Sequence, residues 1–210
     1  MKTFLTTMAM AFSALMMSVS SFAGEGPVSS AASALSERLL AIDSLQGKFQ
    51  QTLTADDGEL LQESAGDFAL NKQGQYRWET TEPFAQLLIG DKQSLLLYDP
   101  DLEQLNRRRL SDAERQTPLF ILSSQDHSLS DNYHIETIEQ GFQLKPKETS
   151  SSFSKMDLLF DAELPSEIIV WDSLGQKTHI RLITSEANKT LPQSLFAFEP
   201  PPGTDIVDEG

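Results

Sequence analysis

The sequence predicts a mainly β fold, in which antiparallel strands follow one another as a meander and build one large curved sheet or barrel. Short apolar runs alternate with turn signals along most of the chain, as in the hairpin turn Asp56-Asp57-Gly58. Helical spacing is confined to two segments. The 210 residues suit one domain, and no linker divides them. No longer repeat is present, so propellers and solenoids are not supported.

The N-terminus has the features of a secretory signal. Lys2 precedes an apolar stretch from Phe4 to about Val19, and Ser21-Phe22-Ala23 fits a signal-peptidase site. We therefore expect residues 1–23 to be cleaved, which leaves 24–210 as one domain. The alternative, a membrane anchor, is disfavoured because the apolar run is short and contains threonine and serine.

Cysteine content and charge exclude several classes of protein. The chain has no cysteine, so it forms no disulfide or thiolate metal site, and it lacks the cysteine that a bacterial lipoprotein needs at its cleavage site. It carries 16 basic against 31 acidic residues, a net charge of −15. This charge disfavours nucleic acid and anionic lipid as partners. It serves solubility, or docking to basic patches of partner proteins.

One amphipathic helix is expected at the start of the mature chain. Ser29 or Ser30 can accept the free N–H groups of its first turn. An apolar stripe at helical spacing then runs to the end of the helix near residue 42, through Ala32, Leu35, Leu39 and Ile42. The stripe is expected to pack on the sheet.

The first group of strands follows this helix. Phe49, Gln51 and Leu53 alternate with polar residues, which is the period of a strand. Pro83 ends one strand because proline cannot donate to a ladder. The expected strands cover about residues 46–53, 60–70, 76–78, 84–89, 94–98 and 102–106.

A short helix is predicted next. Thr117-Pro118 provides a capping hydroxyl followed by proline at the first helical position. Leu119 to Leu122 are apolar on every side, so the helix is buried or faces an apolar cavity. Without further information, an ordinary core-filling helix is the favoured interpretation.

Strand patterns then resume to the end of the chain. A hairpin at Asp172–Gly175 joins two of them, and the prolines at 200–202 stop the last. The acidic tail from Gly203 is expected to be partly mobile. The expected strands are 133–138, 142–145, 155–160, 167–171, 177–184 and 195–198.

No catalytic or metal-binding constellation is found. The three histidines, His127, His134 and His179, are widely separated, and no nucleophile motif or phosphate-binding glycine loop occurs. Asp99 to Glu103 lacks the spacing of a calcium loop. The one basic cluster, Arg107–Arg109, either neutralises nearby acids or docks to an acidic partner.

An ordered set of motifs covers nearly the whole mature chain. It consists of Gly66-Asp67-Phe68, Tyr76-Arg77-Trp78, Pro83-Phe84, Leu87-Leu88-Ile89, Leu97 to Gln104, Thr117-Pro118, Tyr133, Phe142-x-Leu144-x-Pro146 and Phe196-x-Phe198-x-Pro200-Pro201-x-Gly203. This order resembles the LolA-type family of periplasmic outer-membrane lipoprotein carriers.

The resemblance implies an unclosed β-barrel with an N-terminal helix and short lid helices over an apolar cavity. It implies a periplasmic chaperone, expected to be a monomer without enzymatic activity, cofactor or metal. Such a chaperone accepts acylated lipoproteins from an inner-membrane ABC transporter, shields their acyl chains and delivers them to an outer-membrane receptor. Alternatives are a carrier of other lipids or acyl chains, an envelope adaptor with a protein-binding groove, and a hydrolase, which lacks any nucleophile–base signature.

The resemblance also assigns site residues. Tyr76 and Trp78 lie where the family has cavity-facing aromatic residues, and three lid residues are expected, Leu119, Phe120 and Leu122. Lys72 occupies the position of an arginine that holds the family's lid closed. Lysine keeps the charge but loses the planar fork of donors, so the substitution is not equivalent. The lid latch is thus Lys72, with Arg77 or the 107–109 run as alternatives.

Overall fold

The computed structural model describes residues 28–111, 117–123, 129–148, 151 and 153–209. The predicted signal segment, 1–23, and His127 lie outside these residues. Among the described residues, no helix is long and apolar enough to span a bilayer. The helices are α1 (Val28–Leu40), α2 (Pro118–Ser123), α3 (Leu129–Asn132) and the 3₁₀ turn η2 (Gln193–Phe196).

The rest of the described chain is built mainly of strands, as predicted. They are β1 (Ser44–Thr54), β2 (Leu60–Asn71), β3 (Tyr76–Glu82), β4 (Gln86–Gly90), β5 (Ser94–Asp99), β6 (Gln104–Arg109), β7 (Tyr133–Ile138), β8 (Gly141–Pro146), β9 (Lys155–Asp161), β10 (Leu164–Trp171), β11 (Lys177–Ala187) and β12 (Asp205–Glu209).

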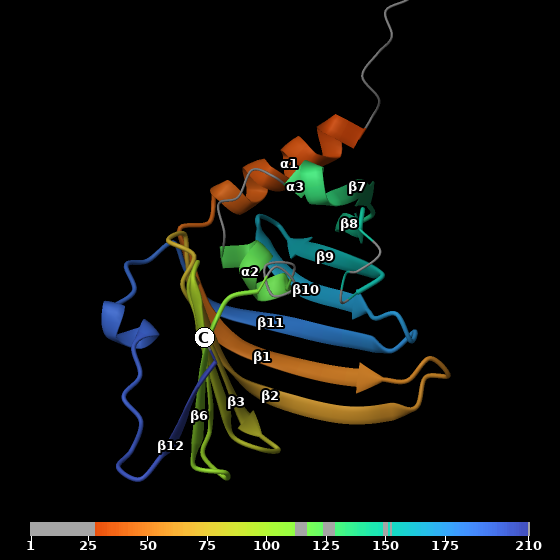
Figure 1. Ribbon diagram of the computed structural model, residues 1–210. Coiled ribbons are helices and arrows are strands. Elements are labelled where there is room, and N and C mark those ends of the chain that lie inside the picture. The colour runs from red at the N-terminus through yellow and green to blue at the C-terminus, as the bar shows by residue number, and fades with distance from the viewer. Residues whose placement is uncertain (1–27, 112–116, 124–128, 149–150, 152, 210) are drawn as a thin grey trace, which may run out of the picture.

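All described strands form one sheet in the order β12-β6-β5-β4-β3-β2-β1-β11-β10-β9-β8-β7. β12 pairs with β6 in parallel, and the other neighbours are antiparallel. The two outer strands, β12 and β7, are not paired with each other, so the barrel does not close. Figure 1 shows the sheet curving around α2. The prediction of a mainly β, unclosed antiparallel sheet with an N-terminal helix is confirmed.

The concave face of the sheet holds the main core. Side chains alternate along a strand, so every second residue points to this face. On β1, Leu45 and Phe49 are buried there, and α1 adds Leu35 and Leu39 at one end of the sheet. The apolar stripe of α1 therefore packs as the sequence predicted, although the helix ends at Leu40 and not near residue 42.

The convex face of β3 to β6 carries a second, smaller apolar cluster. Leu87, Ile89 and Leu105 are buried on this face, although none belongs to the main core. The C-terminal segment covers them through Phe196, and the rings of Tyr98 and Phe198 lie 4.7 Å apart. Strands covered on both sides read as continuous apolar runs, which explains the run Leu87-Leu88-Ile89.

The C-terminal segment corrects two expectations. The strand predicted at 195–198 is absent, because residues 193–196 form the 3₁₀ turn η2 and Ala197 follows as extended chain. The acidic tail, expected to be partly mobile, forms β12 on the edge of β6. Prolines 200–202 cannot donate hydrogen bonds, so ladder pairing begins only after them.

Candidate functional site

The concave wall is centred on an aromatic stack. Phe49 on β1 and Trp78 on β3 lie with ring centroids 3.7 Å apart and planes inclined by 23°. Phe68 on β2 pairs with Trp78 across the ladder, and their ring centroids are 6.1 Å apart. Stacked and tilted ring pairs of this kind add to the stabilisation from burial. Three adjacent strands thus share one rigid apolar platform.

Two glycines create room for this platform. A Cβ at Gly66 would lie 2.8 Å from a ring carbon of Phe49 and 1.9 Å from the carbonyl oxygen of Glu79. A Cβ at Gly90 would lie 2.2 Å from the Tyr76 ring. Both glycines therefore allow an aromatic ring to lie flat on the sheet.

Helix α2 covers part of the platform. Its residues Phe120, Ile121 and Leu122 are buried in the main core, and Leu119 is half-buried against it. The helix contacts β2 and β3, and Figure 1 shows it inside the curve of the sheet. The buried hydroxyl of Ser123 donates to the carbonyl of Phe120. The apolar composition of this helix is therefore explained by burial on the concave wall.

The concave wall contains a hollow on β1 to β5. A cavity of about 450 Å³ opens here, and its apolar lining includes Trp78, Leu88 and Leu97. Tyr76 is only 2% exposed and lies in the core behind this hollow. Of the two aromatic residues assigned from the resemblance, Trp78 thus reaches the hollow directly, while Tyr76 packs behind it.

The hollow also has polar walls that the sequence analysis did not single out. Its lining includes Gln51, Gln62, Ser64, Thr80 and Gln86. The ladder places these residues on the same face as Phe49 and Trp78, because Gln51 opposes Ser64 and Thr80 opposes Gln86. The alternation of side chains along each strand could have placed them on the concave face. They were missed because polar residues in a strand are normally interpreted as facing solvent.

The side chain of Lys72 bonds to a residue that precedes β1 and not to α2. Its ammonium group bonds to the carboxylate of Asp43 at 2.6 Å, and its backbone N–H donates to the carbonyl of Asp43. Both groups are about half-exposed. The charge of Lys72 is therefore directed to the connection between α1 and β1.

The alternative latch residues point elsewhere. Arg77 on β3 bonds to Glu79 at 2.8 Å and donates to the carbonyl of Leu195, so its guanidinium faces the C-terminal segment on the convex side. The arginines of the 107–109 run are exposed on β6, next to the acidic strand β12.

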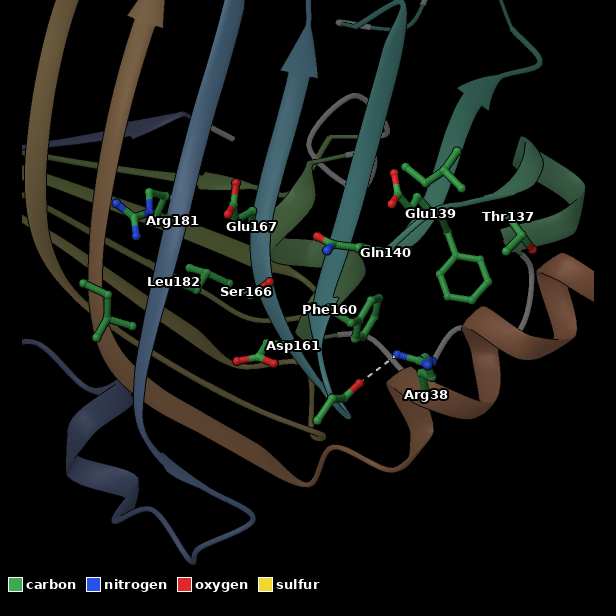
Figure 2. Close-up of a pocket in the computed structure, with 15 residues that line it drawn as sticks. Arg38, Thr137, Glu139, Gln140, Phe160, Asp161, Ser166, Glu167, Arg181 and Leu182 are labelled. Carbon is green, nitrogen blue, oxygen red and sulfur yellow. Dashed lines mark hydrogen bonds between the residues drawn. The ribbon is translucent and has the colours of Figure 1, made fainter.

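A second cavity, of about 590 Å³, lies where α1 meets the turns after β7 and β9 (Figure 2). Arg38 donates to the carbonyl of Ala162 at 3.0 Å and lies over the ring of Phe160 at 4.9 Å. Glu167 and Arg181 add charge to the lining. Charged walls of both signs do not suit an acyl chain, because the charges would lose their hydration.

The histidines and acidic residues of the described part of the chain were compared with the arrangements that metal binding or acid–base chemistry requires. That part contains no group of three or more His, Asp or Glu residues that could hold a metal ion. His179 lies 2.6 Å from Glu167, on the convex face, and His134 is exposed. These two histidines lie on different strands, β11 and β7.

Comparisons with known proteins agree on one family. Residues 41–199 match the family described as outer membrane lipoprotein carrier protein LolA. The chain is similar to an outer-membrane lipoprotein carrier protein of Pseudomonas fluorescens, with 34% identity over 83% of this chain and 86% of the relative. A protein of the same description from Pseudomonas putida is 33% identical over 91% of this chain and 93% of its own length.

Solved structures agree on the fold. A LolA superfamily protein from Nitrosomonas europaea aligns with a TM-score of 0.50 at 16% identity, over 81% of this chain and 97% of that one. An uncharacterized conserved protein from Thermus thermophilus aligns with a TM-score of 0.55 at 12% identity, over 85% of this chain and 99% of the other.

Proposed function

This chain belongs to the family of outer-membrane lipoprotein carrier proteins of the LolA type, and we propose that its concave hollow is the site that shields the acyl chains of a lipoprotein. The family assignment makes it a lipoprotein chaperone. The site, the lid and the partners are inferred from the arrangement of the described residues and from the family.

The observation that carries the proposal is an apolar wall on which a short helix is packed. Trp78 lines the hollow of about 450 Å³, and Phe120 and Leu122 are buried in the same core cluster as Trp78. Pockets that hold one drug-sized ligand measure roughly 300–1,000 Å³. The hollow lies in the lower part of this range, so it is too small for several acyl chains. Cargo with two or three chains therefore needs α2 to move. We propose α2 as the lid, with Leu119, Phe120 and Leu122 as its lipid-facing residues.

Energetics explain why a cover is useful. Burial of an acyl chain gains about 0.8 kcal/mol per CH₂, so several fully buried chains would exceed the range in which non-covalent binding saturates, roughly −18 to −21 kcal/mol. A carrier with such affinity would not release its cargo. Undocking α2 exposes its apolar residues to water, and this cost offsets part of the gain. Affinity then stays low enough for hand-off.

The source and destination of the cargo follow from the family. We propose that the chain is periplasmic, accepts acylated lipoproteins from an inner-membrane ABC transporter and delivers them to an outer-membrane receptor as a monomer. Energy from ATP acts at the transporter, since this chain has no phosphate-binding motif. The chaperone itself carries out no catalysis. The predicted signal at 1–23 and domain at 24–210 fit this route.

One alternative keeps the same site and changes the ligand. Because lysine stands at position 72 and bonds to Asp43 instead of α2, the lid can be held differently from that of the family. A LolA-like carrier of free lipids or other acyl chains is the second candidate. Purification from the native host followed by mass spectrometry separates the two. Diacylated or triacylated polypeptides support the lipoprotein carrier, and free lipid alone supports the alternative.

Depletion tests the proposed function in the cell. Without this chain, outer-membrane lipoproteins should accumulate at the inner membrane, and addition of the purified protein to spheroplasts should release them. Correct sorting after depletion, with no release from spheroplasts, would contradict the proposed function.

A further inference from the structure

We propose that the concave hollow recognises the polar head of its cargo as well as the acyl chains, through a polar zone at the outer part of the wall. The zone consists of Gln51, Gln62, Ser64, Thr80 and Gln86. This inference rests on the proposed function, because it assigns a role to a second part of the same site.

The wall changes from apolar to polar along neighbouring strands. On β1, Phe49 is followed on the concave face by Gln51. On β3, Trp78 is followed by Thr80, and on β4 Gln86 precedes Leu88. In each of these strands the polar residue lies farther from the end of the sheet that α1 covers. The boundary therefore belongs to the whole wall and not to a single residue.

The side chains of the polar zone are open to a ligand. Within the described part of the chain, the side chains of these five residues form no hydrogen bond with another residue. Their polar atoms are not among the buried side-chain atoms that lack a hydrogen-bond partner, which are the hydroxyl oxygens of Ser151 and Thr184. The zone therefore offers amide and hydroxyl groups to water or to cargo.

A bare acyl chain does not match this zone. A hydrocarbon laid over it would strip water from amide and hydroxyl groups without replacing the hydrogen bonds, which is unfavourable. The head of a lipoprotein does match, because its glycerol esters, amide groups and peptide backbone contain both acceptors and donors. Glutamine amides can donate and accept at once, so they suit such a mixed partner.

The zone also gives the cargo a direction. Acyl chains lie toward Trp78 and α2, and the lipid-modified N-terminus lies between Gln51 and Gln86, near the exposed loop that contains Phe84. The polypeptide part of the cargo then leaves the carrier beside the β3–β4 loop, at the end of the strands away from α1. The convex faces of β1 and β3 do not contact the cargo in this arrangement.

Two double variants of identical composition test the proposal. Gln51→Leu with Thr80→Val removes hydrogen-bonding groups from the concave zone. Gln50→Leu with Thr52→Val removes the same groups from the convex face of β1, where both residues line a hollow of about 600 Å³ that borders the polar zone at Gln51 and Ser64. Fluorescence titration measures binding of a dipalmitoylated cysteinyl peptide and of the hydrocarbon probe diphenylhexatriene to each protein.

The concave pair should weaken lipopeptide binding about tenfold, in line with the loss of two or more hydrogen bonds, and should not weaken binding of the hydrocarbon probe. The convex pair should change neither affinity. Equal affinities of all proteins for the lipopeptide, or equal losses for both ligands in the concave pair, would show that the polar zone only faces water.

The controls separate this inference from the proposed function. If the wild-type protein bound neither ligand, the proposed function itself would be wrong. Where the concave pair reduces folding, Gln62→Leu serves as the second variant, because Gln62 is exposed at the start of β2. It should weaken lipopeptide binding selectively as well. No selective loss in either variant would overturn the polar-zone proposal.

Discussion

The two faces of β3 to β6 carry similar apolar side chains but have different covers. On the convex face, the C-terminal segment covers Leu87, Ile89 and Leu105, and its own chain is fixed by the ladder of β12. On the concave face, the six-residue helix α2 covers part of the wall, which also contains a hollow. We infer from this difference that one face serves stability, and we propose that the other keeps apolar surface available for cargo.

The convex cluster should give the largest loss of stability. Leu105 is fully buried between β6 and its cover, so Leu105→Ala should lower the free energy of unfolding by about 2–5 kcal/mol. Urea unfolding measures this loss. Lipopeptide binding per folded molecule should be unchanged. A large drop in binding would contradict the division between the two faces.

The matching change on the concave face is Phe120→Glu. A charge among apolar side chains is unfavourable, and the short helix can undock to bring the charge into water. Lipopeptide affinity should therefore fall at least tenfold, whereas the free energy of unfolding should fall by less than in Leu105→Ala. Release of lipoproteins from spheroplasts provides the functional readout. Normal release by this variant would contradict the assignment of α2 as the lid.

The β7 end of the concave face should behave as permanent core. Burial raises the pKa of Tyr133 to about 12, and its ring is stacked with Phe153 at 6.1 Å. Because the folded pKa lies above the unfolded value of about 10, the neutral hydroxyl favours folding below pH 10. This contribution is lost as pH rises toward 12, and it is on the order of 2–3 kcal/mol for a shift of about two units.

Unfolding free energies of the wild type and Tyr133→Phe, compared at pH 8 and pH 11, measure this contribution. The wild type should lose more stability between the two pH values than the variant does. Parallel losses in both proteins would show that the Tyr133 hydroxyl does not titrate differently on folding.

Lys72 should give the smallest effect. Its ion pair with Asp43 is about half-exposed, and such pairs contribute roughly 0–1 kcal/mol. Lys72→Ala should therefore change the free energy of unfolding by about 1 kcal/mol or less. Uptake of the hydrocarbon probe should proceed at the wild-type rate, as it should in Lys72→Arg. Faster uptake in the alanine variant, or slower hand-off in the arginine variant, would show that Lys72 is the latch.

The strands were predictable because their signals are local. Turn residues such as Asp56-Asp57-Gly58 and the alternation around Phe49 fix both the position of a strand and the face of each side chain. The C-terminal segment was not predictable in this way. Its structure depends on the convex surface that covers Phe196 and on the edge of β6, both of which are tertiary features.

The site was predictable only in part. Trp78 and Phe120 were assigned to the site from the resemblance, and both are buried in one core. Their contact with cargo stays a prediction. The polar zone was missed because Gln51 and Thr80 look like ordinary solvent-facing residues until the register places them beside Trp78. The ion pair of Lys72 was not predictable either, because its partner Asp43 lies 29 residues away in the sequence.

Site-specific photocrosslinking tests the central claim most directly. A photoreactive phenylalanine analogue is placed at Leu88, which lines the concave hollow, or at Ile183, which is 51% exposed on the convex side. Each protein is loaded with a lipoprotein, irradiated and analysed by mass spectrometry. Our account predicts crosslinks from position 88 to the acyl chains and none from position 183. Crosslinks of equal yield at both positions, or at position 183 alone, would contradict it.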